Sequence, residues 1–363
     1  MFDVSLEISC RQFFDGDSLR GSHRLVIAES GIIESITPFP GTADVPLISP
    51  GFVDVQMNGF RDVNVSDASK EELQVLDNYL LSAGTTTWLG TIVTAPLERL
   101  THSIQFLHSV VASREVAGFA GVHIEGPFLG NAPGAHNTKH IVAFDMKWIS
   151  GLPQSIRMMT VAPEQDDAGT AIRALCDLGI TVALGHSRPT KQQFEDAVDA
   201  GARMVTHLFN GMSGIHHRDP GLALWSLTNP KVAVGLIADL VHVQTDAVAL
   251  AFQAAGTRVC LVSDSVAWMR PENSGGRIEI KDGAPRLPDG TLAGSSTPLG
   301  VCVQNAVQQC GVSLDRALAS ATSMPADTVG LTGVGRIRVG QPSDILALSE
   351  DLSVLKAWRR LPS

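Results

Sequence analysis

Apolar, β-type runs alternate with amphipathic helical segments eight times through the interior of this 363-residue chain. The eight runs lie at 51–56, 85–93, 118–125, 156–163, 180–187, 203–209, 232–239 and 258–265. They are nearly continuous in hydrophobic residues, which is typical of parallel strands buried on both faces. Eight strand–helix units predict an α/β fold, a closed (β/α)8 barrel of the TIM type. An open doubly wound sheet is the less favoured alternative, because no GxGxxG follows the first run.

Two of the intervening segments carry explicit helix signals. SKEELQVLDNYLLSAG begins with Ser69 and Glu72, which are spaced as a capping box, and it closes on Gly84. TKQQFEDAVDAG repeats the pattern with Thr190 and Gln193. The helical reading of the segments between the strands therefore has local support.

The two ends of the chain differ from its middle. Residues 1–50 and 335–363 hold short β-like pieces separated by turn residues, and neither end is long enough to bury a core alone. We expect them to combine into a small β-sandwich domain beside a barrel of residues 51–334. The stretch 266–292 is rich in Gly, Pro and Asp and predicts a long loop or hairpin.

Composition excludes several classes of protein. Hydrophobic residues make up 44% and charged residues 18%, as in folded globular chains, and no apolar run reaches the roughly 18 residues of a membrane span. The N-terminus does not resemble a signal peptide. Five scattered cysteines without a CxxC pair indicate reduced thiols in a cytoplasm, and a net charge of -10 argues against nucleic acid as a partner. A small anionic substrate is still compatible with this negative net charge, since a few local Arg or His residues can bind it.

Polar residues follow the apolar runs at the end where barrel enzymes keep their catalytic groups. Glu125, His186 and His207 offer one carboxylate and two imidazoles, a set that suits Zn²⁺ or another divalent transition metal with open positions. Each histidine alone could merely satisfy a backbone hydrogen bond. Because burying three such groups without a partner is costly, their combination favours a metal site.

Other polar residues suggest the rest of a reaction. Asp264 follows the last run and could cap the next segment or act as the general base beside a metal. His136 lies on a Gly/Pro-rich loop, as an exposed loop histidine or as a hydrogen-bond donor to a carbonyl under attack. Arg218, in HHRDPG, is either an ordinary surface arginine or a phosphate clamp.

Several strings resemble the N-acetylglucosamine-6-phosphate deacetylase family of the amidohydrolase superfamily. They are PGFVDVQMNG (50–59), HIEGPFL (123–129), GHS (185–187), THLFNGM (206–212), IADLVHV (237–243), LVSD (261–264), LAGS (292–295) and GRIRVGQPSDILAL (335–348). The resemblance covers essentially the whole chain in the right order. It implies hydrolysis of N-acetylglucosamine 6-phosphate to glucosamine 6-phosphate and acetate, in a homodimer whose partner subunit helps to close the phosphate site.

The resemblance also implies roles for individual residues. Glu125, His186 and His207 would hold the metal, Asp264 would be the acid/base and His136 would contact the N-acetyl carbonyl. The residues expected to bind the sugar and its phosphate are His242, Asn210, Gly211 and Arg218. At the exit of the first strand the chain has Gln56-Met57-Asn58 where many superfamily members have HxH, which predicts a single metal, zinc first and iron also compatible.

Two departures from the family pattern fall where selectivity is set. Trp268, Met269 and Arg270 follow LVSD in place of small residues, and the loop after Asn58 lacks the usual second glycine. The galacto epimer of the substrate is therefore an alternative, as is an amidohydrolase acting on another small amide. A catalytically inactive barrel that serves as a binding protein is a remote third reading, because the proposed ligands and Asp264 are all present.

Overall fold

The computed structural model describes residues 5–269 and 278–360, and its centre is a sheet of eight parallel strands. In the order in which they pair, the strands are β6 (Phe52–Met57), β9 (Thr85–Val93), β10 (Phe119–Glu125), β11 (Ile156–Val161), β12 (Thr181–Leu184), β13 (Met204–Val205), β14 (Ala233–Leu236) and β15 (Val259–Leu261). A parallel bridge joins Met57, at the end of β6, to Ser265, four residues beyond β15. The (β/α)8 barrel expected from the sequence is confirmed.

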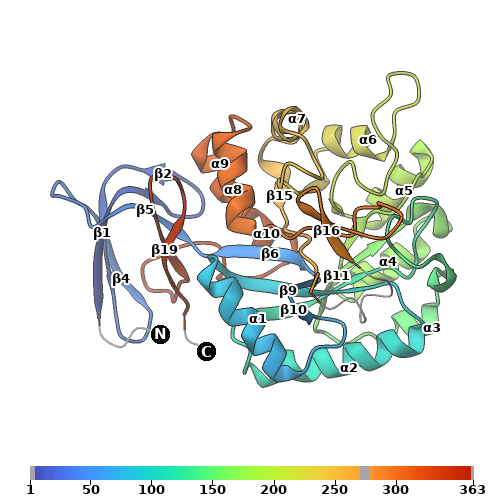
Figure 1. Cartoon of the computed structure of the whole chain (residues 1–363), viewed down its shortest axis with the longest axis horizontal. Coiled ribbons are helices and arrows are strands. Elements are labelled where there is room, and N and C mark those ends of the chain that lie inside the picture. The colour runs from blue at the N-terminus through green and yellow to red at the C-terminus, as the bar shows by residue number, and fades with distance from the viewer. Residues whose placement is uncertain (1–4, 270–277, 361–363) are drawn as a thin grey trace.

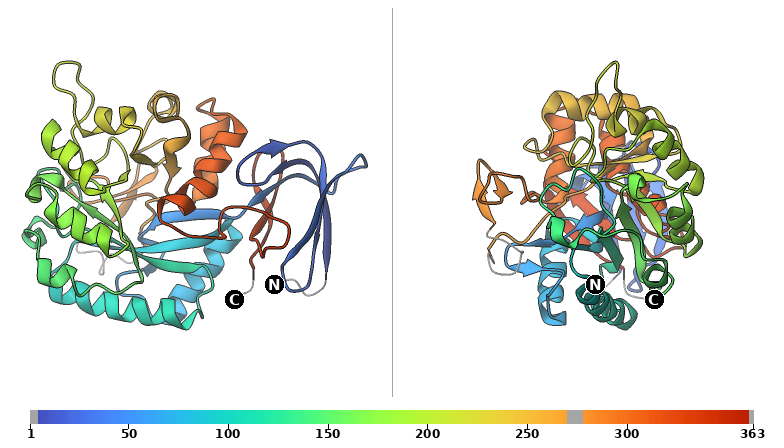
Figure 2. Two further views of the ribbon diagram at one scale, coloured as in Figure 1. Left: turned by 180° about the vertical axis from the view of Figure 1, so that it is seen from behind. Right: turned by 90° about the vertical axis from the view of Figure 1, so that its right-hand side faces the viewer.

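Helices connect successive strands and ring the barrel (Figures 1 and 2). The main ones are α1 (Lys70–Ser82), α2 (Leu97–Ser113), α4 (Thr170–Asp177), α5 (Lys191–Ala200), α6 (Leu222–Thr228), α7 (Thr245–Ala255) and α8 (Leu299–Gln308). The shorter α3 (Met146–Ile149) lies between β10 and β11, and α9 (Leu314–Ser320) and α10 (Ser323–Thr328) follow α8. Among the described residues, single turns of 3-10 helix form η1 (Thr138–His140), η2 (Pro163–Gln165) and η3 (Gly256–Arg258). No helix in the described ranges is long and apolar enough to cross a membrane.

The two predicted capping boxes are both present. At the start of α1, the Ser69 hydroxyl accepts from the Glu72 amide at 3.2 Å, while the Glu72 carboxylate accepts from the Ser69 amide at 2.8 Å. Thr190 and Gln193 make the same reciprocal pair at α5. The local sequence therefore fixes where these helices begin.

Both ends of the chain contribute to a second sheet (left in Figure 1). Its strands run in the order β19 (Val354–Trp358), β18 (Ile345–Leu348), β5 (Val45–Pro50), β1 (Leu6–Phe14), β3 (His23–Ile27) and β4 (Ile33–Pro38), with β2 (Leu19–Arg20) paired to β1. The antiparallel pairing of β18 with β5 joins the late part of the chain to the early part. This sheet buries its own apolar cluster, which includes Phe13, Leu25 and Ile345.

A buried ion pair at Arg359, the residue after β19, joins that sheet to the barrel. The Arg359 guanidinium donates to both carboxylate oxygens of Asp77 on α1, at 2.5 and 3.0 Å. The indole N–H of Trp88, on β9, donates to the same carboxylate at 2.8 Å. Because the charge of Asp77 is paired and hydrogen-bonded, its burial is satisfied.

The long segment after β15 contains the hairpin that its composition indicated. Strand β16 (Glu279–Lys281) pairs with β17 (Ala284–Arg286). A second small hairpin, β7 (Gly59–Phe60) with β8 (Val63–Asn64), follows β6. Of the residues that depart from the family pattern, Arg270 lies outside the described residues, whereas Trp268 and Met269 are described.

Candidate metal centre and active site

Four polar side chains from four strand ends meet in the interior of one end of the barrel. Glu125 is the last residue of β10, His186 and His207 lie two residues beyond β12 and β13, and Asp264 lies three beyond β15. All four are buried. Three possible ligand atoms form a compact triangle. They are Glu125 Oε1, His186 Nε2 and His207 Nε2, and each lies 3.0 Å from the other two.

Backbone strain helps to aim these groups. His186, His207 and Asp264 have φ values of 50°, 26° and 48°, in the left-handed region that non-glycine residues rarely adopt. The chain thus turns sharply as it leaves each strand, at residues that point side chains into the site. Strain of this kind is commonly concentrated at functional sites.

The loop around His186 fixes the orientation of its ring. Its Nδ1 lies 3.1 Å from the carbonyl oxygen of Ala132, which can only accept, so Nδ1 carries an N–H and, in the neutral ring, Nε2 keeps the lone pair that could bind a metal. Gly211 packs against the same edge of the ring with φ of 55°, and a Cβ there would lie 2.8 Å from His186 Nδ1. Position 211 therefore requires glycine both for its backbone angle and for space.

Charges in the cluster shift one another's pKa values. Burial would raise the pKa of Glu125, but hydrogen bonds with His186 and His207 hold it well below its usual range. Burial would lower the pKa of His207, but the Glu125 carboxylate raises it to about 9. A fixed negative charge that faces two imidazole nitrogens attracts either a proton or a metal cation.

His136 reaches the cluster from the loop after β10. Its Nε2 lies 3.2 Å from His186 Nε2 and 4.0 Å from Glu125 Oε1. Burial, and then the neighbouring His186, lower the pKa of His136 to about 3. The ring is therefore neutral and can donate one hydrogen bond while accepting another.

The donor set fits a metal ion. Glu125, His136 and His186 offer donor atoms within 4.8 Å of one another, and His207 completes the tighter triangle with Glu125 and His186. Tetrahedral zinc with bonds of about 2.0–2.1 Å separates its ligand atoms by roughly 3.3 Å. The 3.0 Å triangle is nearer to that spacing than the 4.0 Å between His136 and Glu125, so geometry favours His207 over His136 as the third ligand.

Two side-chain amides, from Gln56 and Asn58, hold the carboxylate of Asp264. Its Oδ1 accepts from Asn58 Nδ2 at 2.8 Å and from Gln56 Nε2 at 3.1 Å. Burial, and then the charge of Glu125, raise the pKa of Asp264 to about 7, which is suited to taking and giving a proton near neutral pH. The sequence alone had identified Gln56 and Asn58 only as poor metal ligands, and their contact with Asp264 was missed.

His242 is paired with an acid that the sequence reasoning also missed. Asp239 Oδ2 lies 2.8 Å from His242 Nδ1 and also accepts from the Ser295 hydroxyl at 2.8 Å. Although burial would raise it, the hydrogen bond with His242 lowers the pKa of Asp239 to about 2. Asp239 therefore holds the proton of His242 on Nδ1 and leaves Nε2 for another partner. The signal was present in IADLVHV, where the acid precedes the histidine by three residues.

Asn210, Gly211 and Arg218 follow His207 but do not stay together. Asn210 Nδ2 lies 3.3 Å from the carbonyl oxygens of His207 and Leu208, so this residue remains beside the cluster. Arg218 belongs to an exposed stretch, 214–219, which we call the arm. The arm precedes α6 and extends well beyond the helices that ring the barrel (Figures 1 and 2).

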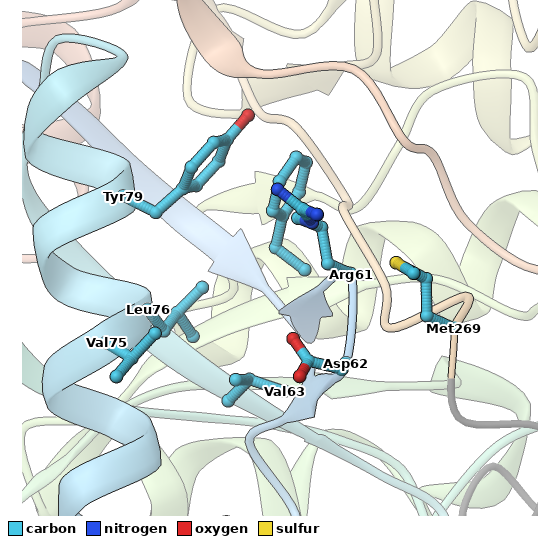
Figure 3. Close-up of a pocket in the computed structure, with 8 residues that line it drawn as sticks. Arg61, Asp62, Val63, Val75, Leu76, Tyr79 and Met269 are labelled. Carbon is cyan, nitrogen blue, oxygen red and sulfur yellow. The ribbon is translucent and has the colours of Figure 1, made fainter.

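A cavity of about 320 Å³ lies between α1 and the β7–β8 hairpin (Figure 3). Arg61, Asp62 and Tyr79 supply its polar lining, and Met269 closes one side. Phe60 stacks on Tyr79 and meets the edge of Trp268, with ring centroids 3.9 and 4.5 Å apart. Trp268 and Met269 therefore pack against the hairpin that follows Asn58.

The sequence of this chain is similar to those of known proteins along most of its length. The sequence profile of the amidohydrolase family matches residues 47–360. An N-acetylglucosamine-6-phosphate deacetylase of Vibrio furnissii is 32% identical over 353 residues, which cover 92% of this chain and 88% of the relative. An N-acetylgalactosamine-6-phosphate deacetylase of Escherichia coli O157:H7 is 31% identical, with 97% of each chain covered.

A solved structure is similar along the same length. It is a mutant of the N-acetyl-D-glucosamine-6-phosphate deacetylase of Mycobacterium smegmatis, in complex with N-acetyl-D-glucosamine-6-phosphate. The two chains superpose with a TM-score of 0.91 at 30% identity, and 98% of each is covered.

Proposed function

This chain belongs to the amidohydrolase family, and we propose that it hydrolyses the N-acetyl amide of N-acetylglucosamine 6-phosphate to glucosamine 6-phosphate and acetate. The observation that carries the proposal is the convergence of a carboxylate, two imidazoles and an acid of near-neutral pKa at the end of the barrel. Matches to deacetylases of this substrate along nearly the whole chain support it.

In this proposal Glu125, His186 and His207 hold one divalent transition metal, with zinc the first choice and iron also compatible. A metal ion there supplies Lewis acidity to the amide carbonyl and lowers the pKa of a water molecule. Because amides are poor ligands for such metals, Gln56 and Asn58 leave the neighbouring position without a second ion.

Asp264 moves the proton of the reaction. Its carboxylate takes a proton from the water whose oxygen attacks the carbonyl carbon. The same carboxyl then gives that proton to the amide nitrogen as the C–N bond breaks, which yields the free amine and acetate. A pKa of about 7 suits both directions.

Neutral His136 donates a hydrogen bond to the carbonyl oxygen as negative charge develops on it. The low pKa of the buried ring favours this neutral donor role over that of a general acid. The sugar lies against His242, Asn210 and Gly211, and Asp239 keeps Nε2 of His242 directed to the substrate.

We further propose that the protein is a homodimer in which the arm of one subunit reaches the phosphate of the partner's substrate. The arm is exposed and extends away from its own barrel, and it carries Arg218 beside two histidines. A guanidinium binds phosphate through paired hydrogen bonds. The family resemblance, which implies dimers with a shared phosphate site, supports the same arrangement.

Two broader parts of the proposal concern location and domains. Five free cysteines and a phosphorylated substrate suit a cytoplasmic enzyme. Residues 51–334 would form the catalytic barrel, while 1–50 with 335–363 would form a small β-domain, in keeping with the separate apolar cluster of the terminal sheet.

N-acetylgalactosamine 6-phosphate is the second candidate substrate. The Escherichia coli relative named for that sugar is 31% identical over 97% of this chain, close to the 32% of the Vibrio furnissii relative named for N-acetylglucosamine 6-phosphate. Trp268 and Met269 are the residues most suited to setting this choice, since they follow Asp264 closely.

The direct test is amine release from both sugar phosphates, with bound metal counted in the same preparations. We expect turnover of the gluco substrate with about one metal per chain, and a loss of roughly 10²–10⁴-fold in Asp264→Asn with its metal retained. Turnover of the galacto epimer alone would assign N-acetylgalactosamine 6-phosphate as the substrate and would leave the proposed reaction unchanged. A metal-loaded protein that cleaves neither sugar would contradict the proposal.

A further inference from the structure

The two oxygens of Asp264 have different surroundings. Oδ1 accepts from two side-chain amides, Asn58 Nδ2 at 2.8 Å and Gln56 Nε2 at 3.1 Å. Both donors come from β6 and the residue just after it, on the opposite edge of the barrel seam. Asn58, Gln56 and Asp264 are all buried, so water does not compete freely for these hydrogen bonds.

The direction of the Gln56 amide follows from its neighbours. Its Nε2 also lies 3.4 Å from each oxygen of Glu125, and an amide oxygen in that place would face two carboxylates. Only the NH2 group can donate to both acids. Gln56 thus lies between the proposed metal ligand and the proposed acid/base.

The backbone of Asp264 is held on both sides as well. Its amide donates to the Gln56 carbonyl at 3.0 Å, and its carbonyl accepts from the Ser295 amide at 2.8 Å. With φ fixed at 48°, the freedom that remains to the side chain is rotation about its own bonds. The amides of Gln56 and Asn58 restrict that rotation.

We propose that Gln56 and Asn58 are positioning residues that make Oδ1 of Asp264 a permanent acceptor, so that Oδ2 alone takes and gives the proton. A proton on Oδ1 would weaken two existing hydrogen bonds at once, whereas a proton on Oδ2 leaves both intact. The catalytic consequence rests on the proposed amide hydrolysis. The same atom would then serve both proton transfers, and the carboxyl would not rotate between them.

The kinetic test uses Asn58→Leu, which removes one donor and keeps the same branched side-chain skeleton, and Asn58→Asp, which keeps the shape and places an acceptor against Oδ1. Met57→Leu is the matched control, because Met57 lies between the two amides on the same buried strand and its replacement conserves volume. We expect kcat to fall roughly ten- to a hundredfold in Asn58→Leu, and further in Asn58→Asp, with KM and metal content unchanged. Met57→Leu should retain wild-type kcat.

A kcat within threefold of wild type in Asn58→Leu would overturn the inference, as would a loss explained by missing metal or shared by Met57→Leu. A purely structural role would lower thermal stability and metal content without this selective loss of kcat.

Crystal structures of the wild type and of Asn58→Leu give a readout that needs no substrate. We expect Oδ1 on both amides in the wild type, and a rotated or doubly occupied Asp264 carboxyl in the variant. An unmoved carboxyl in the variant would refute positioning by Asn58. If the wild type cleaves neither sugar phosphate, the proposed function fails, and these structures still decide the inference.

Discussion

The Nε2 atoms of His186 and His207 lie 3.0 Å apart, and each is also 3.0 Å from Glu125 Oε1. Two neutral imidazoles cannot both donate along these lines, because His186 has its N–H committed to the Ala132 carbonyl. The His186 lone pair therefore faces both the Glu125 carboxylate and His207 Nε2, at the point where a metal ion would bind. This relationship is the geometric basis of the proposed metal centre.

Replacing His207 with alanine should remove the metal and the activity together. We expect metal content well below one ion per chain and a loss of kcat on the order of 10³-fold or more, since a catalytic metal contributes several kcal/mol. Metal analysis and amine-release assays check this. His102→Ala, an exposed histidine on α2, is the control and should keep both. A His207→Ala protein with a full metal complement would point to His136 as the third ligand.

Replacing Arg218 with alanine should weaken binding of phosphorylated substrate in particular. A charge-assisted hydrogen bond contributes about 1.5–3 kcal/mol, so KM for the sugar phosphate should rise roughly ten- to a hundredfold. Turnover of the unphosphorylated sugar should not change. Arg173→Ala, an exposed arginine on α4, serves as the control. Equal losses on both substrates would argue against a phosphate contact.

Mixed dimers test whether the arm acts on the partner. Arg218→Ala subunits have an intact acid/base, and Asp264→Asn subunits have an intact arm. A co-refolded or co-expressed mixture should regain activity at low substrate, because one site of each mixed dimer then combines both functional parts. Activity that stays at the sum of the separate variants would place Arg218 in its own subunit's site, or outside any site.

Asp54 offers a prediction on pH and stability. Burial raises the pKa of this carboxyl from 3.8 to about 6, so the folded protein binds its proton more tightly than the unfolded chain. The contribution of Asp54 to stability is thus present below about pH 4 and is lost as pH rises to about 6. Asp54→Asn keeps an oxygen acceptor for the Gln56 and Ser263 amides and does not ionise.

Urea unfolding of metal-free wild type and Asp54→Asn at pH 4.5 and 7.5 measures this effect. Relative to wild type, the variant should gain about 2 kcal/mol of unfolding free energy between the two pH values. A difference between the proteins that does not depend on pH would show that Asp54 does not titrate in this window.

The polar residues that follow the barrel strands could be predicted from the sequence. Glu125, His186, His207 and Asp264 each follow an apolar run, and the closed barrel brings the carboxyl ends of all eight strands to one rim. Proximity in space therefore follows from the order of elements, without any knowledge of side-chain contacts. The capping boxes at Ser69 and Thr190 were predictable for a different reason, because they are contained within four residues.

The hydrogen bonds that hold Asp264 and Asp239 could not be predicted from the sequence in the same way. Gln56 and Asn58 meet Asp264 across 208 and 206 residues of chain, at the seam where the first strand returns to the last. The three-residue spacing in IADLVHV signals the pair of Asp239 with His242, but only the fold brings Ser295 to Asp239 from 56 residues away. Such partners depend on which side chains face each other across strands, which the periodicity of one segment does not specify.

The pairing of β18 with β5 has a consequence for the order in which the molecule is made. About 295 residues separate the two strands, so at ordinary elongation rates β5 emerges from the ribosome roughly 15–60 s before its partner exists. During that interval β5 presents an open edge, to which a strand from another nascent chain can add. The barrel can fold before the terminal sheet is complete. The last strands synthesised, β18 and β19, then pair at the open edge of β5 and complete that sheet.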